Sequence, residues 1–270
     1  MTQFLPYQSQ GWHGRIAKDW LDEFTDLNSW LNAHPGEPVV NFPSREVHRV
    51  ETPRGAVYVK ILHNGSGGDA CDSFDLVGNL KWFVRPSRAL AILRISQDLL
   101  DEGFICPTPI LAARRRGTAG WPTDLFISRE CRVATLAQWL QQAPPLAHVR
   151  ATLGTVAREL RRLHDAGFVH GDCTPYNLAL TERGTLVLFD NDRTTHRPAL
   201  LHRKRLEWRS VAGFGMRLMQ IMQDPQVLQE FLACYSRPEE AERIAAFTLK
   251  RLRAKGLDAL MPTDWPARSP

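Results

Sequence analysis

Four polar residues have types and spacings that suit phosphoryl transfer from ATP. Lys60 follows the apolar run "AVYV", Asp172 and Asn177 lie five positions apart in "GFVHGDCTPYNLAL", and Asp190 follows "TLVLF". This chemistry needs a cation on the phosphates, oxygen ligands for Mg²⁺, and a carboxylate that orients or deprotonates the attacking hydroxyl. We therefore expect Lys60 to bind phosphate, Asp172 to face the acceptor hydroxyl, and Asn177 and Asp190 to bind Mg²⁺. We expect His170 to brace the loop by hydrogen bonding.

The same loop has alternatives without kinase chemistry. Asp172 and Asn177 are common turn formers, and Lys60 at a strand end can be a solvated side chain. Cys173 has two further interpretations: a catalytic nucleophile or, with His170 and Asp172, a ligand in a zinc site. A zinc site would need a fourth ligand. A nucleophilic thiol would need a second histidine at motif spacing, and the sequence has none there, which favours Cys173 as a packing residue.

Composition is typical of a globular protein in a reducing compartment. Of the 270 residues, 43% are hydrophobic and 23% charged, with a net charge of +5. The five cysteines are odd in number and form no CxxC pair, which argues against a disulfide framework. We see no signal peptide and no apolar run of the roughly 18 residues that span a bilayer. These features predict a cytoplasmic protein, and the basic charge favours an anionic partner.

The elements that must position these residues change in character along the chain. Residues 16–31 space apolar side chains by three and four, which predicts a helix within an N-terminal helical extension at 1–39. Residues 40–131 indicate a sheet-rich lobe: a hairpin around "TPRG", a loop at 63–74, a helix at 87–103 with Ser87 as its N-cap, and two further strands.

The chain beyond residue 131 reads as mainly helical. Leu153, Val156, Leu160 and Leu163 form one apolar helix face, and Gly167 closes that helix just before the polar loop. Residues 132–261 are therefore expected to form a second lobe, followed by a flexible tail at 262–270. The predicted fold class is α+β, with a small antiparallel sheet in the first lobe and helices in the second.

These residues carry a resemblance to the protein-kinase-like superfamily. "VHGDCTPYN" resembles its H-x-D-x-x-x-x-N catalytic loop, "AVYVK" its lysine strand, and "LFDND" its metal-binding segment, in that order over about 45–195. The resemblance implies a two-lobed kinase fold that uses ATP and Mg²⁺, with Lys60 and Glu130 binding the nucleotide. Ile92 stands where the helix glutamate that pairs with the lysine is expected, so no partner is assigned to Lys60.

Details of the motifs favour a sugar kinase. Protein kinases carry a lysine where this chain has Thr174, and no Gly-rich loop precedes Lys60. "VYVKIL", the segment at 85–113 and "FDNDR" are similar to the lipopolysaccharide core kinases, which phosphorylate Kdo or heptose. That resemblance implies an inner-core glycolipid acceptor. Two alternatives stay open: a small-molecule kinase of the aminoglycoside or choline type, and a pseudokinase that binds a partner.

Two basic runs could add contacts to an anionic surface. Residues 114–116 and 202–209 are rich in arginine and lysine. A basic segment near an anionic membrane gains about 1 kcal/mol per cationic side chain. We therefore expect either peripheral contact with the inner face of the inner membrane or two solvated faces, and no nucleic-acid partner.

Overall fold

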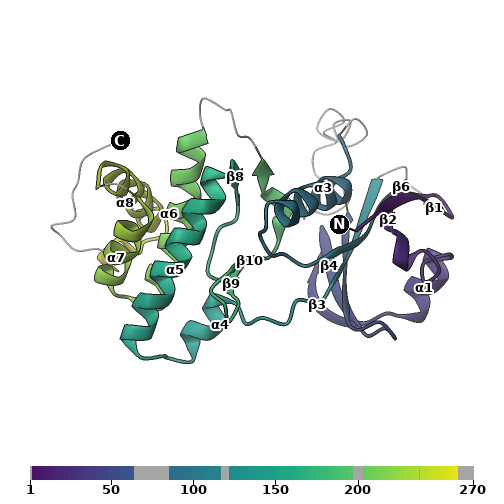
Figure 1. Ribbon diagram of the computed structural model, residues 1–270, viewed down its shortest axis with the longest axis horizontal. Coiled ribbons are helices and arrows are strands. Elements are labelled where there is room, and N and C mark those ends of the chain that lie inside the picture. Colours follow the sequence, from purple (N-terminus) through teal and green to yellow (C-terminus); the bar gives the residue numbers. More distant parts are fainter. Residues whose placement is uncertain (1, 64–84, 117–121, 197–202, 237, 261–270) are drawn as a thin grey trace. The chain divides into compact units, whose positions relative to one another are not determined.

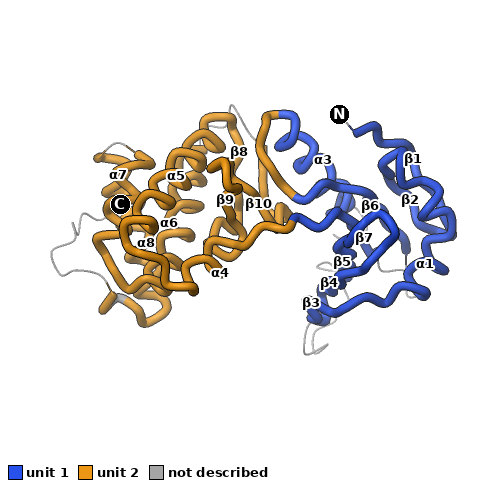
Figure 2. The backbone as a smooth tube through the Cα atoms, turned by 60° about the horizontal axis from the view of Figure 1, so that its bottom comes forward, with its two compact units in different colours: residues 1–101, 107–131 blue, residues 102–106, 132–270 orange. Residues whose placement is uncertain are grey.

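The computed structural model describes residues 2–63, 85–116, 122–196, 203–236 and 238–260. The chain forms two compact units, residues 1–101 with 107–131 and residues 102–106 with 132–270 (Figure 2). Most of the loop expected at 63–74 and all of the tail expected at 262–270 lie outside the described residues. Within the described part, no helix is both long and apolar enough to cross a membrane.

The first unit is built on one antiparallel sheet of seven strands (Figure 1). The order across the sheet is β1-β2-β6-β7-β5-β4-β3, so the strand that carries Lys60 lies inside the sheet, between β7 and β4. The strands are β1 (Phe4–Ser9), β2 (Trp12–Ala17), β3 (Glu37–Phe42), β4 (Arg45–Val50), β5 (Val57–His63), β6 (Pro109–Arg116) and β7 (Pro122–Arg129). The expected hairpin is confirmed, because β4 and β5 pair antiparallel around the turn at residues 51–56.

The helical extension predicted for residues 1–39 is wrong. Residues 4–17 form the hairpin β1-β2, and β2 joins the sheet through β6. Its turn places Gln10 and Gly11 at positive φ (44° and 83°), as tight hairpin turns require. Gly14 fits because a Cβ there would collide with the carbonyl oxygen of Ala112 on β6. The helix that does form, α1 (Leu27–Ala33), begins late, at the N-cap Asp26.

The two faces of this sheet bury different partners. On one face, Val57 and Val59 pack with the N-terminal segment, including Trp20 and Trp30. On the other face, Leu62 packs with Ile92 of helix α3 (Arg88–Asp101). Side chains alternate along a strand, so Lys60 shares its face with Leu62, the face that α3 covers. Ile92 is 4% exposed and forms part of this apolar cluster.

A buried carboxylate fixes the start of α3. Asp124 of β7 is fully buried and accepts hydrogen bonds from the Ser87 hydroxyl and the Arg88 backbone N–H. It also forms an ion pair with Arg114, whose Nη2 lies 2.9 Å from Oδ2. The Ser87 hydroxyl accepts from the Leu90 N–H, which confirms the predicted N-cap. Arg114, the first residue of the basic run at 114–116, is therefore held inside the first unit.

The second unit is mainly helical. Its α5 packs against α7 and its α6 against α8, and two short antiparallel strand pairs, β8-β11 and β9-β10, flank the polar loop (Figure 1). Thr135 and Gln138 form a reciprocal capping box at the start of α4. The helices are α4 (Leu136–Gln141), α5 (Leu146–Asp165), α6 (Arg203–Met222), α7 (Pro225–Tyr235) and α8 (Pro238–Arg253). The strands are β8 (Phe168–Val169), β9 (Leu178–Leu180), β10 (Leu186–Leu188) and β11 (Thr195–His196). The predicted α+β class is confirmed, with a sheet first and helices after it.

Candidate active site

The polar loop lies between β8 and β9, and His170 holds it from inside. His170 is fully buried, and its Nε2 lies 2.8 Å from the carbonyl oxygen of Phe189. Its Nδ1 accepts from the backbone N–H of Asp172 at 3.3 Å. Burial lowers the pKa of the imidazole, which keeps the ring neutral with a proton on Nε2. Both ring nitrogens are therefore bonded to the protein and are not available to a zinc ion.

Asn177 connects the loop to the following strand pair. Its Nδ2 donates to the backbone carbonyl of Asp172 at 2.9 Å and to the Asp172 carboxylate at 3.0 Å. Its own backbone carbonyl accepts from the N–H of Phe189, the residue before Asp190. The structure therefore brings Asp172, Asn177 and the start of the Asp190 segment together. Because Nδ2 makes both bonds, the amide is oriented, and its oxygen is directed away from them.

Asp190 follows β10 with a left-handed backbone, at φ 52° and ψ 58°. This region is uncommon for residues other than glycine, although aspartate and asparagine tolerate it best. Asn191 is buried, and its amide bonds the carbonyl of Leu188 and the hydroxyl of Thr194. Hydrogen bonds of a buried side chain therefore hold the short turn that follows Asp190.

Gly171 permits a close approach that a larger residue would block. A Cβ at this position would lie 2.5 Å from the carbonyl oxygen of Arg193 and 2.8 Å from its Cβ. The loop therefore packs directly on the 3₁₀ turn Asn191–Arg193 that follows Asp190. The glycine of the "HGD" motif thus has a steric explanation.

Two further residues support the loop from α6 and from within. The Ser210 hydroxyl of α6 donates to the carbonyl of His170 at 2.8 Å, a contact that sequence spacing could not indicate. Cys173 is 2% exposed, and burial raises the pKa of its thiol to about 12. The thiol thus stays protonated at neutral pH, as expected for a packing residue and not for a nucleophile. Among the described residues, no group of three or more potential metal-binding His, Cys, Asp or Glu side chains occurs.

The two residues expected to bind nucleotide both lie in the first unit. Lys60 is half-buried on β5 and pairs in register with Phe126 of β7 and Val47 of β4. Glu130 follows β7, and its N–H donates to the carbonyl of Ala56. The Glu130 carboxylate forms a two-pronged ion pair with Arg49, at 2.6 and 3.2 Å. This side chain is therefore bound by the protein, which leaves the backbone carbonyl as the group with which Glu130 could contact a nucleotide.

A comparison with known protein families shows which family the chain belongs to. The family model described as "Lipopolysaccharide kinase (Kdo/WaaP) family" matches residues 79–235, more than half of the chain, and the match includes the whole polar loop. The chain belongs to this family. The resemblance that the motifs indicate is confirmed, and kinases are the enzyme class of the family.

Individual relatives match over a shorter stretch. The chain is 25% identical over 120 residues to a 3-deoxy-D-manno-octulosonic acid kinase of Vibrio cholerae, covering 44% of this chain and 50% of the relative. The corresponding kinase of Xylella fastidiosa is 27% identical over 120 residues, with 44% and 47% covered. The chain thus spans about half the length of the curated relatives that it matches.

Two proteins with other names are also similar to part of the chain or to its fold. A RIO-type serine/threonine-protein kinase, Rio1 of Haloferax volcanii, is 36% identical over 104 residues, covering 36% of each chain. The solved structure of the bifunctional kinase-methyltransferase WbdD covers 84% of this chain and 45% of its own, with a TM-score of 0.43 and 16% identity.

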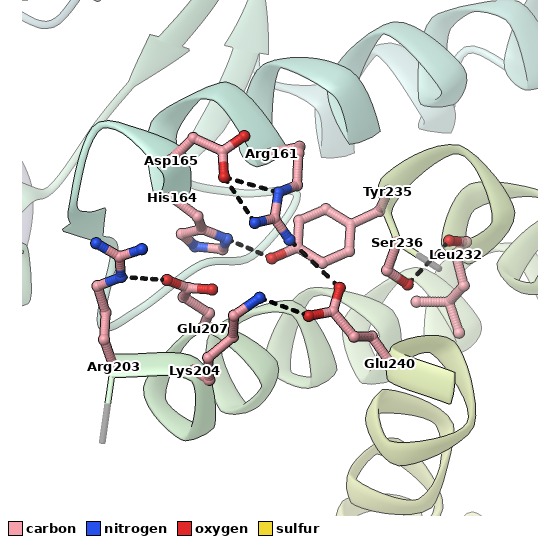
Figure 3. A network of polar contacts seen from close by, with 10 residues as sticks. All are labelled: Arg161, His164, Asp165, Arg203, Lys204, Glu207, Leu232, Tyr235, Ser236 and Glu240. Atoms are coloured by element: carbon pink, nitrogen blue, oxygen red, sulfur yellow. Dashed lines mark hydrogen bonds and ion pairs between the residues drawn. The ribbon is translucent and has the colours of Figure 1, made fainter. Parts of the chain in front are cut away.

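Behind the loop, this Kdo/WaaP family member buries a histidine–tyrosine pair (Figure 3). His164 is the penultimate residue of α5, and its Nδ1 lies 2.6 Å from the hydroxyl of Tyr235 on α7. Both rings are buried. Burial lowers the pKa of His164 to about 3 and raises that of Tyr235, so the neutral hydroxyl donates to the neutral imidazole. This bond ties α5, which leads into the loop, to α7.

Acidification is expected to destabilise the protein between pH 7 and pH 5. The unfolded chain protonates His164 near its ordinary pKa of 6.5, whereas the folded chain does so only near 3. The unfolded state therefore binds more protons in this window, and the free energy of unfolding should fall by about 2 kcal/mol from this residue. His170 shifts in the same direction and adds to the loss. Urea unfolding at both pH values measures the change.

A His164→Asn variant isolates the contribution of this residue. The asparagine oxygen can still accept from Tyr235, but it does not titrate. Between pH 7 and pH 5, the unfolding free energy of this variant should fall by about 2 kcal/mol less than that of wild type. The same pH slope in wild type and variant would contradict a neutral, buried His164.

Proposed function

We propose that this chain is an ATP-dependent kinase that phosphorylates a sugar hydroxyl of the lipopolysaccharide inner core, on Kdo or heptose. The family match at 79–235 is the observation that carries the proposal, because it includes the loop in which Asn177 holds Asp172. Two relatives are named as kinases of 3-deoxy-D-manno-octulosonic acid, which supports a sugar acceptor. We place the protein in the cytoplasm, where ATP is available.

We assign each role in phosphoryl transfer to a residue whose position or hydrogen bonds are described above. Asp172 accepts or orients the proton of the attacking hydroxyl, and the Asn177 amide holds its carboxylate in one orientation. Lys60 binds the α- and β-phosphates from the inner strand β5. The backbone carbonyl of Glu130 accepts a hydrogen bond from the base, because its carboxylate is paired with Arg49. His170 keeps the backbone at Asp172 in place through its Nδ1.

The loop fits a magnesium ion. The ion prefers oxygen ligands, and the amide oxygen of Asn177 and the carboxylate of Asp190 are of that kind. The two hydrogen bonds of Asn177 Nδ2 leave its oxygen available to bind metal. Asn177 and Asp190 would therefore hold the ion, which when bound neutralises charge on the phosphates.

The direct test is a kinase assay on inner-core glycolipid fractions. Mass spectrometry of the product would locate the added phosphate on Kdo or on heptose. Acceptors that lack heptose separate the two sugars. Transfer to a lipid-free amino sugar or choline, with none to the glycolipid, would favour a small-molecule kinase instead.

Nucleotide binding has its own expected result. At 100 times its Kd, Mg-ATP should stabilise the fold by about 2.7 kcal/mol, seen as a rise in melting temperature. Lys60→Gln should reduce this rise because it removes the phosphate-binding cation. Lys18→Gln, on the exposed 3₁₀ turn Lys18–Trp20 of the same unit, is the matched control and should leave it unchanged. No shift with Mg-ATP, together with no ADP formed with any glycan, would indicate a pseudokinase.

A further inference from the structure

A pocket of about 400 Å³ opens beside the polar loop in the second unit. Gly171, the neighbour of Asp172, lines it, and so do Arg193, Arg209 and Arg251. Arg193 ends the 3₁₀ turn after Asp190, Arg209 lies on α6, and Arg251 lies on α8. Three separate elements thus each contribute one arginine to the lining of this pocket, which we call the arginine pocket.

Within the part of the chain that the structure describes, the arginine pocket has no carboxylate partner. No acidic residue lines it there, and none of its three arginines forms an ion pair with a carboxylate. Nearby cations on α6 differ in this respect (Figure 3). Arg203 pairs with the buried Glu207 at 2.8 Å, and Lys204 pairs with Glu240 at 2.7 Å. The basic run at 202–209 is thus divided, and Arg209 is left for the pocket.

Arg251 lies close to a second cation. The residue is half-buried, and its Nη2 donates to the carbonyl of Arg209 at 3.3 Å. Burial and the nearby charge of Arg209 both lower its pKa, so each cation disfavours the other. A bound oxyanion would remove that repulsion, and the planar guanidinium groups match its geometry.

Arg251 and the loop both lie near Gly213 of α6. A Cβ built there would be in ordinary van der Waals contact with both, 3.7 Å from Arg251 Nη1 and 3.4 Å from the carbonyl oxygen of Cys173. The guanidinium and the backbone of the residue that follows Asp172 therefore border the same point of α6. A group held by Arg251 would be held close to the proposed catalytic loop.

We propose that Arg193, Arg209 and Arg251 bind an oxyanion, a carboxylate or a phosphate, that the acceptor carries. The inference rests on the proposed function and sharpens it: the substrate class is an anionic sugar, not a neutral one. The charge on the acceptor then fixes which hydroxyl is presented to Asp172, because the pocket that anchors the sugar is lined by Gly171, the residue before Asp172.

Calorimetry with inorganic phosphate tests the site without any turnover. A saturating non-hydrolysable ATP analogue with Mg²⁺ keeps phosphate out of the proposed nucleotide site, because it also fills the γ-phosphate position. Wild type should bind phosphate, and Arg209→Gln and Arg251→Gln should each weaken binding by about tenfold or more, as expected for lost charge-assisted hydrogen bonds. Arg205→Gln, an exposed arginine one helical turn away on α6 that does not line the pocket, is the matched control. Equal effects of the Arg205 and Arg209 changes, or no binding by wild type, would overturn the proposal.

Kinetics with two matched acceptors test the link to substrate. A Kdo-bearing acceptor and its methyl ester differ in the charge of the carboxylate and by one methyl group. Arg209→Gln should raise KM for the acid about tenfold and leave KM for the ester and for ATP unchanged. Arg251→Lys, which keeps the charge but loses the planar fork, should fall between wild type and Arg251→Gln. If the enzyme transfers phosphate but the Arg209 change leaves KM for the acid unaltered, the pocket proposal fails and the kinase assignment stands. If no transfer occurs to any sugar while phosphate binding still depends on Arg209 and Arg251, the kinase assignment fails and the oxyanion site stands.

Discussion

Replacing Asp172 by asparagine is expected to lower kcat by about 10²- to 10⁴-fold, because the variant loses the carboxylate that accepts the proton of the sugar hydroxyl. Asparagine has the same shape, and its amide oxygen can still accept from Asn177 Nδ2, as the carboxylate does at 3.0 Å. The loop should therefore keep its conformation. Melting temperature and the shift caused by Mg-ATP should both match wild type.

A control variant separates this effect from a general loss of negative charge. Glu182 is exposed in the turn between β9 and β10, so Glu182→Gln removes one charge from the same unit without touching the loop. Its kcat should equal that of wild type. A wild-type-like rate in Asp172→Asn and in Asp172→Ala would rule out the carboxylate as the proton acceptor, whatever the acceptor sugar.

The loop could be predicted from sequence because its chemistry is local. His170, Asp172 and Asn177 lie within eight positions, and their hydrogen bonds run among themselves and to Phe189. A short segment of fixed spacing is enough to specify such a network. The residues that join the loop from a distance had no comparable signal. Ser210 lies 40 positions after the His170 carbonyl that it bonds, and only the packing of α6 reveals the contact.

The N-terminal segment shows why spacing alone can mislead. Ile16, Trp20, Phe24 and Leu27 are all buried, as the predicted apolar face requires, but they lie on a strand end, a 3₁₀ turn, a further turn and a helix start. Steps of three and four are compatible with either a helix or a chain that turns repeatedly over one core. Pairing of β2 with β6, some 100 positions away, decided between them.

The two basic runs are a second case in which the sequence alone did not show how the side chains are used. The sequence presents residues 114–116 and 202–209 as two equivalent cationic stretches. In the structure, Arg114 pairs with buried Asp124, and Arg115 lies over the ring of Trp12 at 4.5 Å. Arg203 and Lys204 have carboxylate partners as well. Contact with a membrane surface therefore has fewer available cations than the composition indicated, and Arg209 belongs to a defined pocket.

Replacing Asp190 by asparagine is expected to reduce phosphoryl transfer by roughly 10²- to 10³-fold or more while leaving the fold intact. The change removes the negative charge proposed to hold Mg²⁺, so the Mg²⁺ concentration needed for half-maximal rate should rise as well. Asparagine tolerates the left-handed backbone of this position, φ 52° and ψ 58°, as well as aspartate does. Titration of the rate with Mg²⁺, beside a melting curve, measures both effects.

Two further substitutions at Asp190 separate metal binding from backbone strain. Asp190→Gly relieves the left-handed conformation and should keep or raise the melting temperature. Asp190→Ala keeps the strain without a side chain suited to it and should destabilise the fold by about 1 kcal/mol. Both should be as inactive as Asp190→Asn, because all three lack the carboxylate. The three variants would then differ in melting temperature although all of them are inactive. If activity instead followed stability, with Asp190→Gly active and Asp190→Ala not, Asp190 would shape the turn before Asn191 and would not be a metal ligand.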